Sequence, residues 1–527
     1  MTRMLNQFWK MKNHNIRLIV ISLMIAVLVS AIIALIMSLV GSQYLQLPPE
    51  TKFGIVCDAG STHTTIFLYH WPADKENETG VVSQLYECDV DEGISSFADD
   101  PPKAGESLRP CLDKVLTYIP SKKQHKTHIS LGATAGMRLL EIQNQSQSRM
   151  VLDEVQKTIR SYPFHFHEAR IISGADEGTC GWITVNYLLE SFLKFSWEGT
   201  WLHPESAQIQ GALDLGGSST QMTFVPTGNT THIAGKVDLK LYGYNYTIYT
   251  HSYLCYGQQQ AIRKYIAKLL KGKDLNSRIE SPCYLSGYET NLTLGFIYDS
   301  PCTSAQRPSP YDRTQNVTIF GSGRPAECKE AIKAIFNFTA CGGSSTCSFD
   351  GIYQPAVNGP FYAFSSFFYT FHFLNLTKGS PSLATAQTTI EGFCSRSWTE
   401  VTAAYQTTKK KWLKDYCISA IYSNILLIDG YKFNSSTWEN IVFKQKAGNT
   451  DIGWALGYML NLTNMIRSES PVVVKAQYRR LWAAACFFLV LTILLSMVSL
   501  MVNYFVNKFK IRPLAESENR SNEAEIP

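Results

Sequence analysis

Two short stretches, far apart in the chain, each place an aspartate, a glycine turn and hydroxyl residues between two apolar runs. Residues 55–62 read Ile-Val-Cys-Asp-Ala-Gly-Ser-Thr, and residues 212–220 read Ala-Leu-Asp-Leu-Gly-Gly-Ser-Ser-Thr. Each predicts a hairpin whose buried first strand carries Asp58 or Asp214 near its end. Amides around a glycine turn can bind phosphate oxygens, and the aspartate can hold a divalent cation through water. Either stretch alone is more often an ordinary turn, but the repetition indicates two related lobes that bind a polyphosphate between them.

A third stretch, residues 127–138, predicts a strand that enters a glycine- and alanine-rich turn and continues into a helix near Met137. Small residues let the backbone approach a ligand, and Thr134 presents a hydroxyl at the strand end. A strand-to-helix connection that needs small residues only for packing explains this pattern equally well.

A fourth stretch places two acidic residues before an apolar helix. A short strand is expected at residues 169–173, and a helix over residues 182–193, with Asp176 as its cap. Glu177 then lies near the positive end of the helix dipole, which favours the ionised carboxylate that a general base needs. On local grounds alone, an ordinary acidic residue at a helix start is the better interpretation.

Three other segments have a weaker connection to chemistry. Residues 451–463 predict a helix whose small residues pack closely against a strand or turn. The aromatic residues of segment 361–373 are mostly expected in the core, although a few could stack on a nucleobase. Because side chains alternate along a strand, His165 and His167 are expected on the same face. No third ligand lies at a spacing that would complete a metal site, so a solvent-exposed strand is the favoured interpretation.

The elements that must position these residues lie between two uncharged apolar stretches, residues 18–40 and 481–506. Each is long enough to cross a membrane as a helix of ~20 residues. The first exceeds the apolar region of a signal peptide and lacks a small-residue cleavage site. The 527 residues suit two lobes between the spans, and a net charge of +5 without a dense basic block does not indicate nucleic-acid binding.

Charges and glycosylation sequons predict the orientation of these spans. Basic residues precede the first span and follow the second, which places tails 1–17 and 507–527 in the cytosol by the positive-inside rule. Arg479 and Arg480, on the other flank of the second span, weaken that signal. The segment between the spans carries ten sequons, which indicate a lumenal or extracellular location: Asn77, Asn144, Asn229, Asn245, Asn291, Asn316, Asn337, Asn375, Asn434 and Asn461.

The cysteines agree with that location. Ten of them form an even set in polar, loop-like surroundings, as structural disulfides in an oxidising compartment require, although sequence spacing leaves their pairing open. Cys57 and Cys180 lie in apolar segments and Cys486 lies in the second span, so these three are expected to be free thiols.

The five stretches at residues 55–62, 127–138, 174–178, 212–220 and 451–463, in this order between two spans, resemble the five apyrase conserved regions of the ecto-nucleoside triphosphate diphosphohydrolase family. The resemblance covers nearly the whole chain. Single motifs of this kind also occur in actin-like and Hsp70-like ATPases and in exopolyphosphatases, but the set of five is highly specific. Segments 250–255, 282–288 and 451–463 look most like the type 8 branch of the family.

This resemblance implies an α/β fold of two actin-like, ribonuclease-H-like lobes with a nucleotide cleft between them, anchored by a transmembrane helix at each end. The first lobe is discontinuous, at residues 49–173 plus 446–478, and the second covers residues 174–445. The implied disulfides are Cys88–Cys111, Cys255–Cys302, Cys283–Cys328, Cys341–Cys347 and Cys394–Cys417.

The resemblance also implies a role for each site residue. Glu177 is the base that activates water, with Thr134, Ser219 and Gln221 positioning that water. Asp58 and Asp214 hold Ca²⁺ or Mg²⁺ through water, supported by Trp454. The phosphate-binding residues are Ser61, Thr62, His63, Gly216, Gly217 and Ser218, and the nucleobase lies between Tyr369 and Trp412. Asp176 stands where the family usually has Gln, Glu or Ala, and a second carboxylate there is expected to disturb the ionisation of Glu177.

The implied function is a plasma-membrane hydrolase that converts extracellular ATP to ADP and then AMP, with UTP and UDP as further substrates. Small and polar residues in the spans, such as Ser30 and Ser496, suggest a homo-oligomer held by the transmembrane helices, although lipid-facing small residues explain them equally well. Two alternatives remain. One is a Golgi or lysosomal lumenal nucleoside diphosphatase, and the other is a nucleotide-binding ectodomain without turnover.

Overall fold

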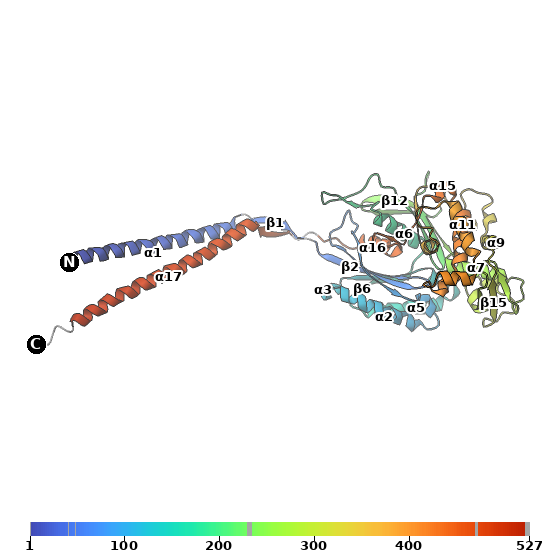
Figure 1. Cartoon of the computed structure of the whole chain (residues 1–527), viewed down its shortest axis with the longest axis horizontal. Coiled ribbons are helices and arrows are strands. Elements are labelled where there is room, and N and C mark those ends of the chain that lie inside the picture. Colours follow the sequence, from blue (N-terminus) through green and yellow to red (C-terminus); the bar gives the residue numbers. More distant parts are fainter. Residues whose placement is uncertain (1, 41, 48, 229–233, 470–472, 522–527) are drawn as a thin grey trace. The chain divides into compact units, whose positions relative to one another are not determined.

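The computed structural model describes the backbone of residues 2–40, 42–47, 49–228, 234–469 and 473–521 (Figure 1). Contacts divide the chain into a terminal unit, Met1–Pro49 with Ser470–Pro527, and a central unit, Glu50–Glu469. The sequon at Asn229, the ends of the two expected cytosolic tails and many of the tail side chains lie outside the described residues.

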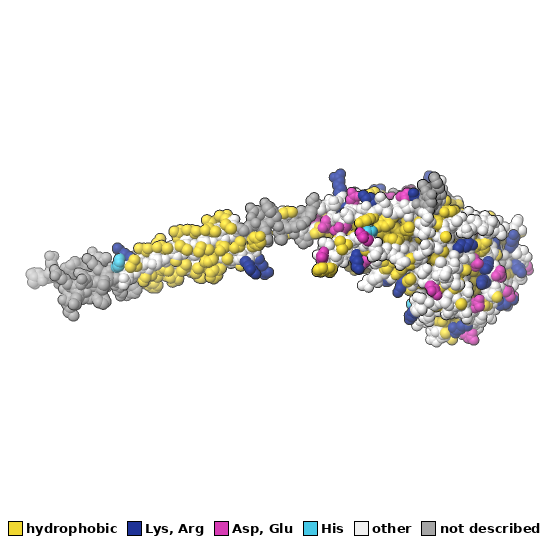
Figure 2. Space-filling model, turned by 90° about the horizontal axis from the view of Figure 1, so that it is seen from above, with side chains coloured by type: hydrophobic (Ala, Val, Ile, Leu, Met, Phe, Trp, Pro, Cys, Tyr) yellow, Lys and Arg dark blue, Asp and Glu magenta, His cyan; other side chains and the backbone are white. Residues whose placement is uncertain are grey.

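The terminal unit contains two long helices, α1 (Thr2–Leu39) and α17 (Arg479–Ser521), and two paired antiparallel strands, β1 (Ser42–Gln46) and β20 (Val473–Gln477). Segments Arg17–Leu39 and Arg479–Phe505 are long and apolar enough to cross a membrane, with mean hydropathies of 3.2 and 2.6. Their surface is almost entirely hydrophobic (Figure 2). Ser30 and Thr492 join the helices through a hydroxyl–hydroxyl hydrogen bond of 2.8 Å, so some of the polar residues in the spans are used within one chain.

The first large sheet of the central unit has five strands in the order β4-β3-β2-β5-β6. Strands β2 and β3 form the first predicted hairpin, and β5 and β6 run parallel to β2. Helices α2 and α5 cover one face of this sheet (Figure 1). The elements are β2 (Thr51–Ala59), β3 (Thr64–Pro72), β4 (Ser83–Val90), β5 (His128–Ala133), β6 (His165–Ile171), η1 (Ile94–Phe97), α2 (Pro101–Tyr118), α3 (Ser121–Gln124), α4 (Ala135–Gln143) and α5 (Gln145–Arg160).

The second large sheet has six strands in the order β11-β12-β10-β9-β16-β17. Strands β9 and β10 form the second predicted hairpin, and β16 runs parallel to β9. The strands are β9 (Gly211–Leu215), β10 (Ser219–Phe224), β11 (Lys236–Leu241), β12 (Tyr244–Leu254), β16 (Phe361–Ser365) and β17 (Ile441–Phe443). The hydrogen-bonded core of each sheet therefore contains one of the two similar stretches.

Helices α6 (Gly174–Leu188) and α16 (Trp454–Thr463) pack against each other between the two sheets (Figure 1). The expectation of a helix over residues 182–193 is wrong, because α6 begins at Gly174 and ends at Leu188. Its N-cap is Ser173 rather than Asp176: the Ser173 hydroxyl accepts the Asp176 N–H at 3.0 Å, and the Asp176 carboxylate accepts the Ser173 N–H at 3.4 Å. This capping box starts the helix before its apolar segment.

The sequence predicted that the small-residue face of α16 packs against a strand or turn. In the structure its main partner is a helix, α6. A Cβ atom at Gly457 would lie 1.9 Å from the carbonyl oxygen of Cys180 in α6. Only glycine allows this approach, and it brings Trp454 at the start of α16 beside the end of β2.

The remaining elements complete the central unit around the second sheet. They include a three-stranded sheet of order β13-β15-β14. The elements are β7 (Lys194–Phe195), β8 (Trp201–Leu202), α7 (Gln258–Leu270), β13 (Ile279–Ser281), β14 (Glu289–Thr293), α8 (Leu294–Tyr298), η2 (Ser304–Gln306), β15 (Asn316–Gly321), α9 (Pro325–Lys333), η3 (Phe338–Cys341), α10 (Ser366–Phe373), α11 (Leu383–Cys394), α12 (Trp398–Ala404), α13 (Lys410–Leu413), α14 (Tyr416–Ile425), η4 (Leu426–Gly430), α15 (Ser435–Trp438), β18 (Lys446–Ala447) and β19 (Thr450–Asp451).

Five disulfides stabilise the central unit by restricting its unfolded chain: Cys88–Cys111, Cys255–Cys302, Cys283–Cys328, Cys341–Cys347 and Cys394–Cys417. Cys57, Cys180 and Cys486 carry free thiols, as the sequence predicts. The asparagines of the nine described sequons are all exposed.

Candidate active site

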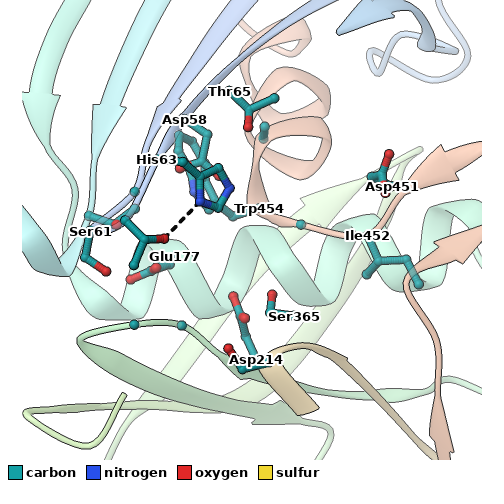
Figure 3. Close-up of a pocket in the computed structure, with 18 of the residues that line it drawn as sticks. Asp58, Ser61, His63, Thr65, Glu177, Asp214, Ser365, Asp451, Ile452 and Trp454 are labelled. Atoms are coloured by element: carbon teal, nitrogen blue, oxygen red, sulfur yellow. Dashed lines mark hydrogen bonds between the residues drawn. The ribbon is translucent and has the colours of Figure 1, made fainter. Parts of the chain in front are cut away.

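A cavity of about 320 Å³ lies between the two large sheets, where the turns of the two predicted hairpins face each other (Figure 3). The β2–β3 turn, the β9–β10 turn and the first residues of α4, α6 and α16 supply most of its wall. The structure thus brings together five sequence stretches that lie up to about 400 residues apart along the chain.

The two turns approach each other so closely that one position requires glycine. A Cβ atom at Gly217 would lie 2.7 Å from the Ser61 hydroxyl oxygen and 2.9 Å from the methyl carbon of Thr62. The carbonyl of Gly217 accepts the backbone N–H of Gln259 at 2.9 Å, which holds the second turn on the start of α7. In the first turn, the Thr62 hydroxyl is hydrogen-bonded to His63 Nδ1 at 2.9 Å (Figure 3).

Asp58 and Asp214 enter the cavity from opposite sides (Figure 3). Burial and, to a lesser extent, the nearby Asp214 raise the pKa of Asp58 to about 7, against the lowering effect of the Trp454 side chain. Burial raises the pKa of Asp214 to about 6, against the lowering effect of Ser365. Asp214 Oδ1 is buried without a hydrogen-bond partner among the described residues. Two buried carboxylates with an unsatisfied oxygen fit a site for a cation.

Glu177, in the first turn of α6, lies in the wall of the same cavity and is almost fully buried. Burial raises its pKa to about 8, Arg138 lowers it, and the negative charges of Asp214 and Asp58 raise it. Gln221 Nε2 donates to Glu177 Oε2 at 2.9 Å and to Ser219 Oγ at 2.7 Å. The carboxylate is therefore fixed in place and has a pKa suited to accepting a proton near neutral pH.

Sequence reasoning missed two residues that hold this group. Arg138 in α4 forms an ion pair with Glu177, and its guanidinium also donates to Ser219 Oγ at 3.3 Å. Ser252 in β12 accepts hydrogen bonds from Gln221 at 3.0 Å and from Arg138 at 3.3 Å. Arg138 could have been found from the sequence, because it is a basic residue in the first turn of a helix that follows a glycine-rich turn. The local sequence around Ser252 gives no comparable signal.

The other predicted polar residues differ in their surroundings. Thr134, at the start of α4, is buried and lines the cavity, and its backbone N–H donates to the Ala59 carbonyl at 3.0 Å. Asp176 instead lies at the exposed start of α6, where its carboxylate accepts from Arg170 at 3.3 Å. The carboxylates that raise the pKa of Glu177 are Asp214 and Asp58 rather than Asp176.

The far end of the cavity is lined by Tyr69, Glu87, Tyr369, Lys446 and Asp451. Tyr369, in α10, is half-exposed and lines the cavity. Trp412, in α13, is also half-exposed but does not line the cavity; its ring lies beneath the Lys411 ammonium at 4.8 Å. The structure therefore brings one of the two expected nucleobase residues to the site.

Direct protein ligands for a metal are not grouped within the described part of the chain. His165 and His167 are exposed on β6, as predicted for a solvated strand. The cavity combines two opposed glycine turns that can bind phosphate oxygens, two buried carboxylates that fit a cation held through water, and a third buried carboxylate that can accept a proton. Such a set of groups could hydrolyse a polyphosphate.

Comparison with known proteins agrees with this geometry. The model of the GDA1/CD39 (nucleoside phosphatase) family matches residues 44–475. The chain is 50% identical over 488 residues to ectonucleoside triphosphate diphosphohydrolase 8 of Gallus gallus, covering 92% of this chain and 98% of the relative. It is 46% identical to the Homo sapiens protein of the same name, covering 90% and 96%, and 45% identical to ectonucleoside triphosphate diphosphohydrolase 3 of Mus musculus, covering 85% of each.

Among solved structures, a nucleoside triphosphate hydrolase from Neospora caninum matches with a TM-score of 0.56 at 12% identity, covering 79% of this chain and 93% of that one. At this identity the match supports the fold alone.

Proposed function

The chain belongs to the GDA1/CD39 (nucleoside phosphatase) family, and we propose that it hydrolyses nucleoside triphosphates and diphosphates, releasing their terminal phosphates in turn to leave a monophosphate. The observation that carries this proposal is the buried Glu177, held by Arg138 and Gln221 in a cavity between two anion-binding turns. The names of its relatives, ectonucleoside triphosphate diphosphohydrolases, support this choice of substrates. ATP, ADP, UTP and UDP are the substrates we expect.

In the proposed mechanism, Glu177 accepts a proton from the attacking water as that water approaches the terminal phosphorus in line with the leaving oxygen. Gln221 holds the carboxylate and also donates to Ser219, and Ser219 and Thr134 line the cavity where they would position the water. The water oxygen bonds to phosphorus, the bond from phosphorus to the bridging oxygen breaks, and the products are phosphate and the shortened nucleotide.

The two turns are proposed to bind the phosphates on either side of the reacting bond, through Ser61, Thr62, His63, Gly216, Gly217 and Ser218. Asp58 and Asp214 would hold Ca²⁺ or Mg²⁺ through water, with Trp454 supporting Asp58. A divalent cation there would neutralise charge on the phosphate oxygens. A monophosphate cannot contact both turns at once, which would explain why hydrolysis ends at that stage.

For the rest of the molecule we propose the division into lobes that the family resemblance implies. Residues 49–173 plus 446–478 form the first lobe, and residues 174–445 form the second. Tyr369 contacts the nucleobase, and Trp412 as its second ring stays a prediction. The central unit is extracellular and both tails are cytosolic. A homo-oligomer is held together by contacts between transmembrane helices of different chains, in addition to the Ser30–Thr492 pair within one chain.

The test measures phosphate release from ATP and from ADP added outside intact cells, with Ca²⁺ or with EDTA. Wild type is compared at equal surface expression with Glu177→Gln and with Glu141→Gln, a matched change at an exposed position of α4. We expect Glu177→Gln to lose at least about 100-fold in rate, as removal of a general base does, and Glu141→Gln to lose nothing.

Full activity of Glu177→Gln would assign the base to another residue. Activity that appears only after permeabilisation would place the central unit in an intracellular lumen. If the wild type is expressed and folded but releases no phosphate from either intact or permeabilised cells, hydrolysis itself is refuted.

A further inference from the structure

A second cavity, of about 310 Å³, lies in the central unit at the edge of the first sheet opposite the candidate active site. The parallel strands β2, β5 and β6 begin there, whereas β2 and β5 end at the active-site turns. Its walls carry three lysines, three histidines and two glutamates, with apolar surface from Phe53, Trp71 and Ile466. None of the residues that line it belongs to the active-site cavity.

Positive charge exceeds negative charge in this cavity. Lys52 forms an ion pair of 3.2 Å with Glu469, and the Lys123 ammonium lies 3.8 Å from Glu50. Lys126 lines the cavity without an ion pair in the described part of the chain. Three lysines thus face two glutamates, which leaves one ammonium without a counter-charge.

The imidazoles add hydrogen-bond donors to the wall. The ring centroid of His128 lies 4.6 Å from that of His165 and 6.4 Å from that of His167. Burial, together with His165, His167 and Lys52, lowers the pKa of His128 to about 4. This ring is therefore neutral near neutral pH, and the positive charge of the cavity comes from its lysines.

Trp71 contributes aromatic surface to the wall. It is 1% exposed and lines the cavity, and its indole N–H makes no hydrogen bond within the described residues. Because that nitrogen is itself buried from solvent, it is not among the donors of the cavity. The wall therefore combines ammonium and imidazole donors with an aromatic and aliphatic surface.

We propose that this cavity is a binding site for a phosphate monoester, with Lys126 and Lys123 directed to the phosphate oxygens and Phe53, Trp71 and Ile466 to the organic part. A monoester matches the wall because it combines several acceptor oxygens with more than one negative charge and an uncharged group. The cavity volume is at the lower end of the range of small-molecule pockets. The monoester can come from a soluble molecule, such as a nucleoside monophosphate, or from the headgroup of phosphatidic acid.

The experiment measures the acetylation of individual lysines by mass spectrometry of peptides, in the full-length protein held in phosphatidylcholine nanodiscs. One arm adds AMP, a second arm incorporates phosphatidic acid into the nanodisc, and a control arm adds sodium chloride at the same ionic strength. Because the readout is residue by residue, binding of AMP at the active site does not interfere. Lys122, next to Lys123 but outside the cavity, is the internal control.

We expect Lys123 and Lys126 to be acetylated at least about threefold more slowly in one of the two monoester arms, with Lys122 unchanged. The arm that protects them identifies the source of the monoester. Lys126→Gln should weaken the protection of Lys123 by about tenfold in ligand concentration, and the matched Lys122→Gln should leave it intact. Both variants should keep the phosphate release of the wild type, which shows that they fold.

Three results would overturn the proposal. The first is no protection in either monoester arm. The second is equal protection of Lys122, which would indicate general screening of charge. The third is protection of Lys123 that persists unchanged in a folded Lys126→Gln protein.

Discussion

The guanidinium of Arg138 forms an ion pair with the carboxylate of Glu177, whose ionisation is opposed by the nearby carboxylates of Asp214 and Asp58. Arg138 follows the strand–turn of the first sheet, and Glu177 begins the helix that packs against the second. The proposed base is thus held by a contact between elements 39 positions apart in sequence. Its charge state depends on that contact.

Replacing Arg138 is expected to change the pH dependence of hydrolysis. Arg138 lowers the pKa of Glu177, which burial raises to about 8, so Arg138→Gln should raise that pKa further. The carboxylate is the active form and exists above its pKa, so the acidic limb of the kcat/KM profile should move to higher pH by about 1–3 pH units. Activity near pH 7 should fall more than activity near pH 9. The profile of Arg149→Gln, at an exposed site of α5, should match the wild type.

Ser252→Ala is expected to impair positioning without removing a reacting group. The Ser252 hydroxyl accepts from both Gln221 and Arg138, the two side chains that hold Glu177. Loss of these two hydrogen bonds should lower kcat by about tenfold, with little change in KM, because the substrate is not contacted. Ser252→Thr, which keeps the hydroxyl, should recover part of kcat. A comparable loss in Tyr244→Phe, which removes a hydroxyl at an exposed position of the same strand, would indicate that any change in β12 has this effect.

Gly217→Ala tests whether the close approach of the two turns matters. The added Cβ would lie 2.7 Å from Ser61 Oγ and 2.9 Å from Thr62, so one turn must shift by several tenths of an ångström. We expect both a higher KM for ATP and a kcat reduced by at least about tenfold, because the phosphates and the attacking water lose their alignment. Gly392→Ala, in a helix where a Cβ meets no atom within 4 Å, should retain wild-type kinetics. Unchanged kinetics in Gly217→Ala would show that the close approach of the two turns is not needed for phosphate binding.

Removal of the divalent cation is expected to make the stability of the central unit fall with rising pH. The pKa values of Asp214, Asp58 and Glu177 are raised from 3.8, 3.8 and 4.5 to about 6, 7 and 8. Between the ordinary and the raised values the folded state binds more protons than the unfolded chain, so the unfolding free energy decreases as pH rises through about 4 to 8. In EDTA, Tm should therefore be lower at pH 8.5 than at pH 5.5.

Addition of Ca²⁺ should raise Tm more at pH 8.5 than at pH 5.5, because the carboxylates are ionised without compensation at the higher pH. Asp58→Asn removes one of the three groups and should reduce both the pH dependence and the Ca²⁺ effect, as thermal unfolding monitored by tryptophan fluorescence would detect. A Tm that rises with pH in EDTA would contradict the buried, uncompensated state of these carboxylates.

Local sequence determined the elements that carry the chemistry. Two kinds of local signal were enough for this: alternating or continuous apolar residues, and glycine at the turns. Both depend only on residues close together in the chain. They predicted the two hairpins with Asp58 and Asp214, the strand–turn–helix at Thr134 and the two apolar spans. The family resemblance then supplied an expectation for Glu177 and for the lobes. The predicted start of α6 was wrong, because the capping box of Ser173 and Asp176 starts the helix earlier in the chain than hydrophobic periodicity indicates.

Only the tertiary structure decided which residues meet. Arg138 and Ser252 are separated by 114 positions, and Gln221 contacts Glu177 across 44 positions, so no local pattern indicates their contacts. The pKa of Glu177 depends on burial and on charges from two other strands, which exist only after the sheets pack together. The cavity of lysines and histidines at the opposite sheet edge has the same origin. The sequence thus determined the chemical groups and the strands that hold them, and packing over long sequence distances determined their neighbours, their charge states and the second cavity.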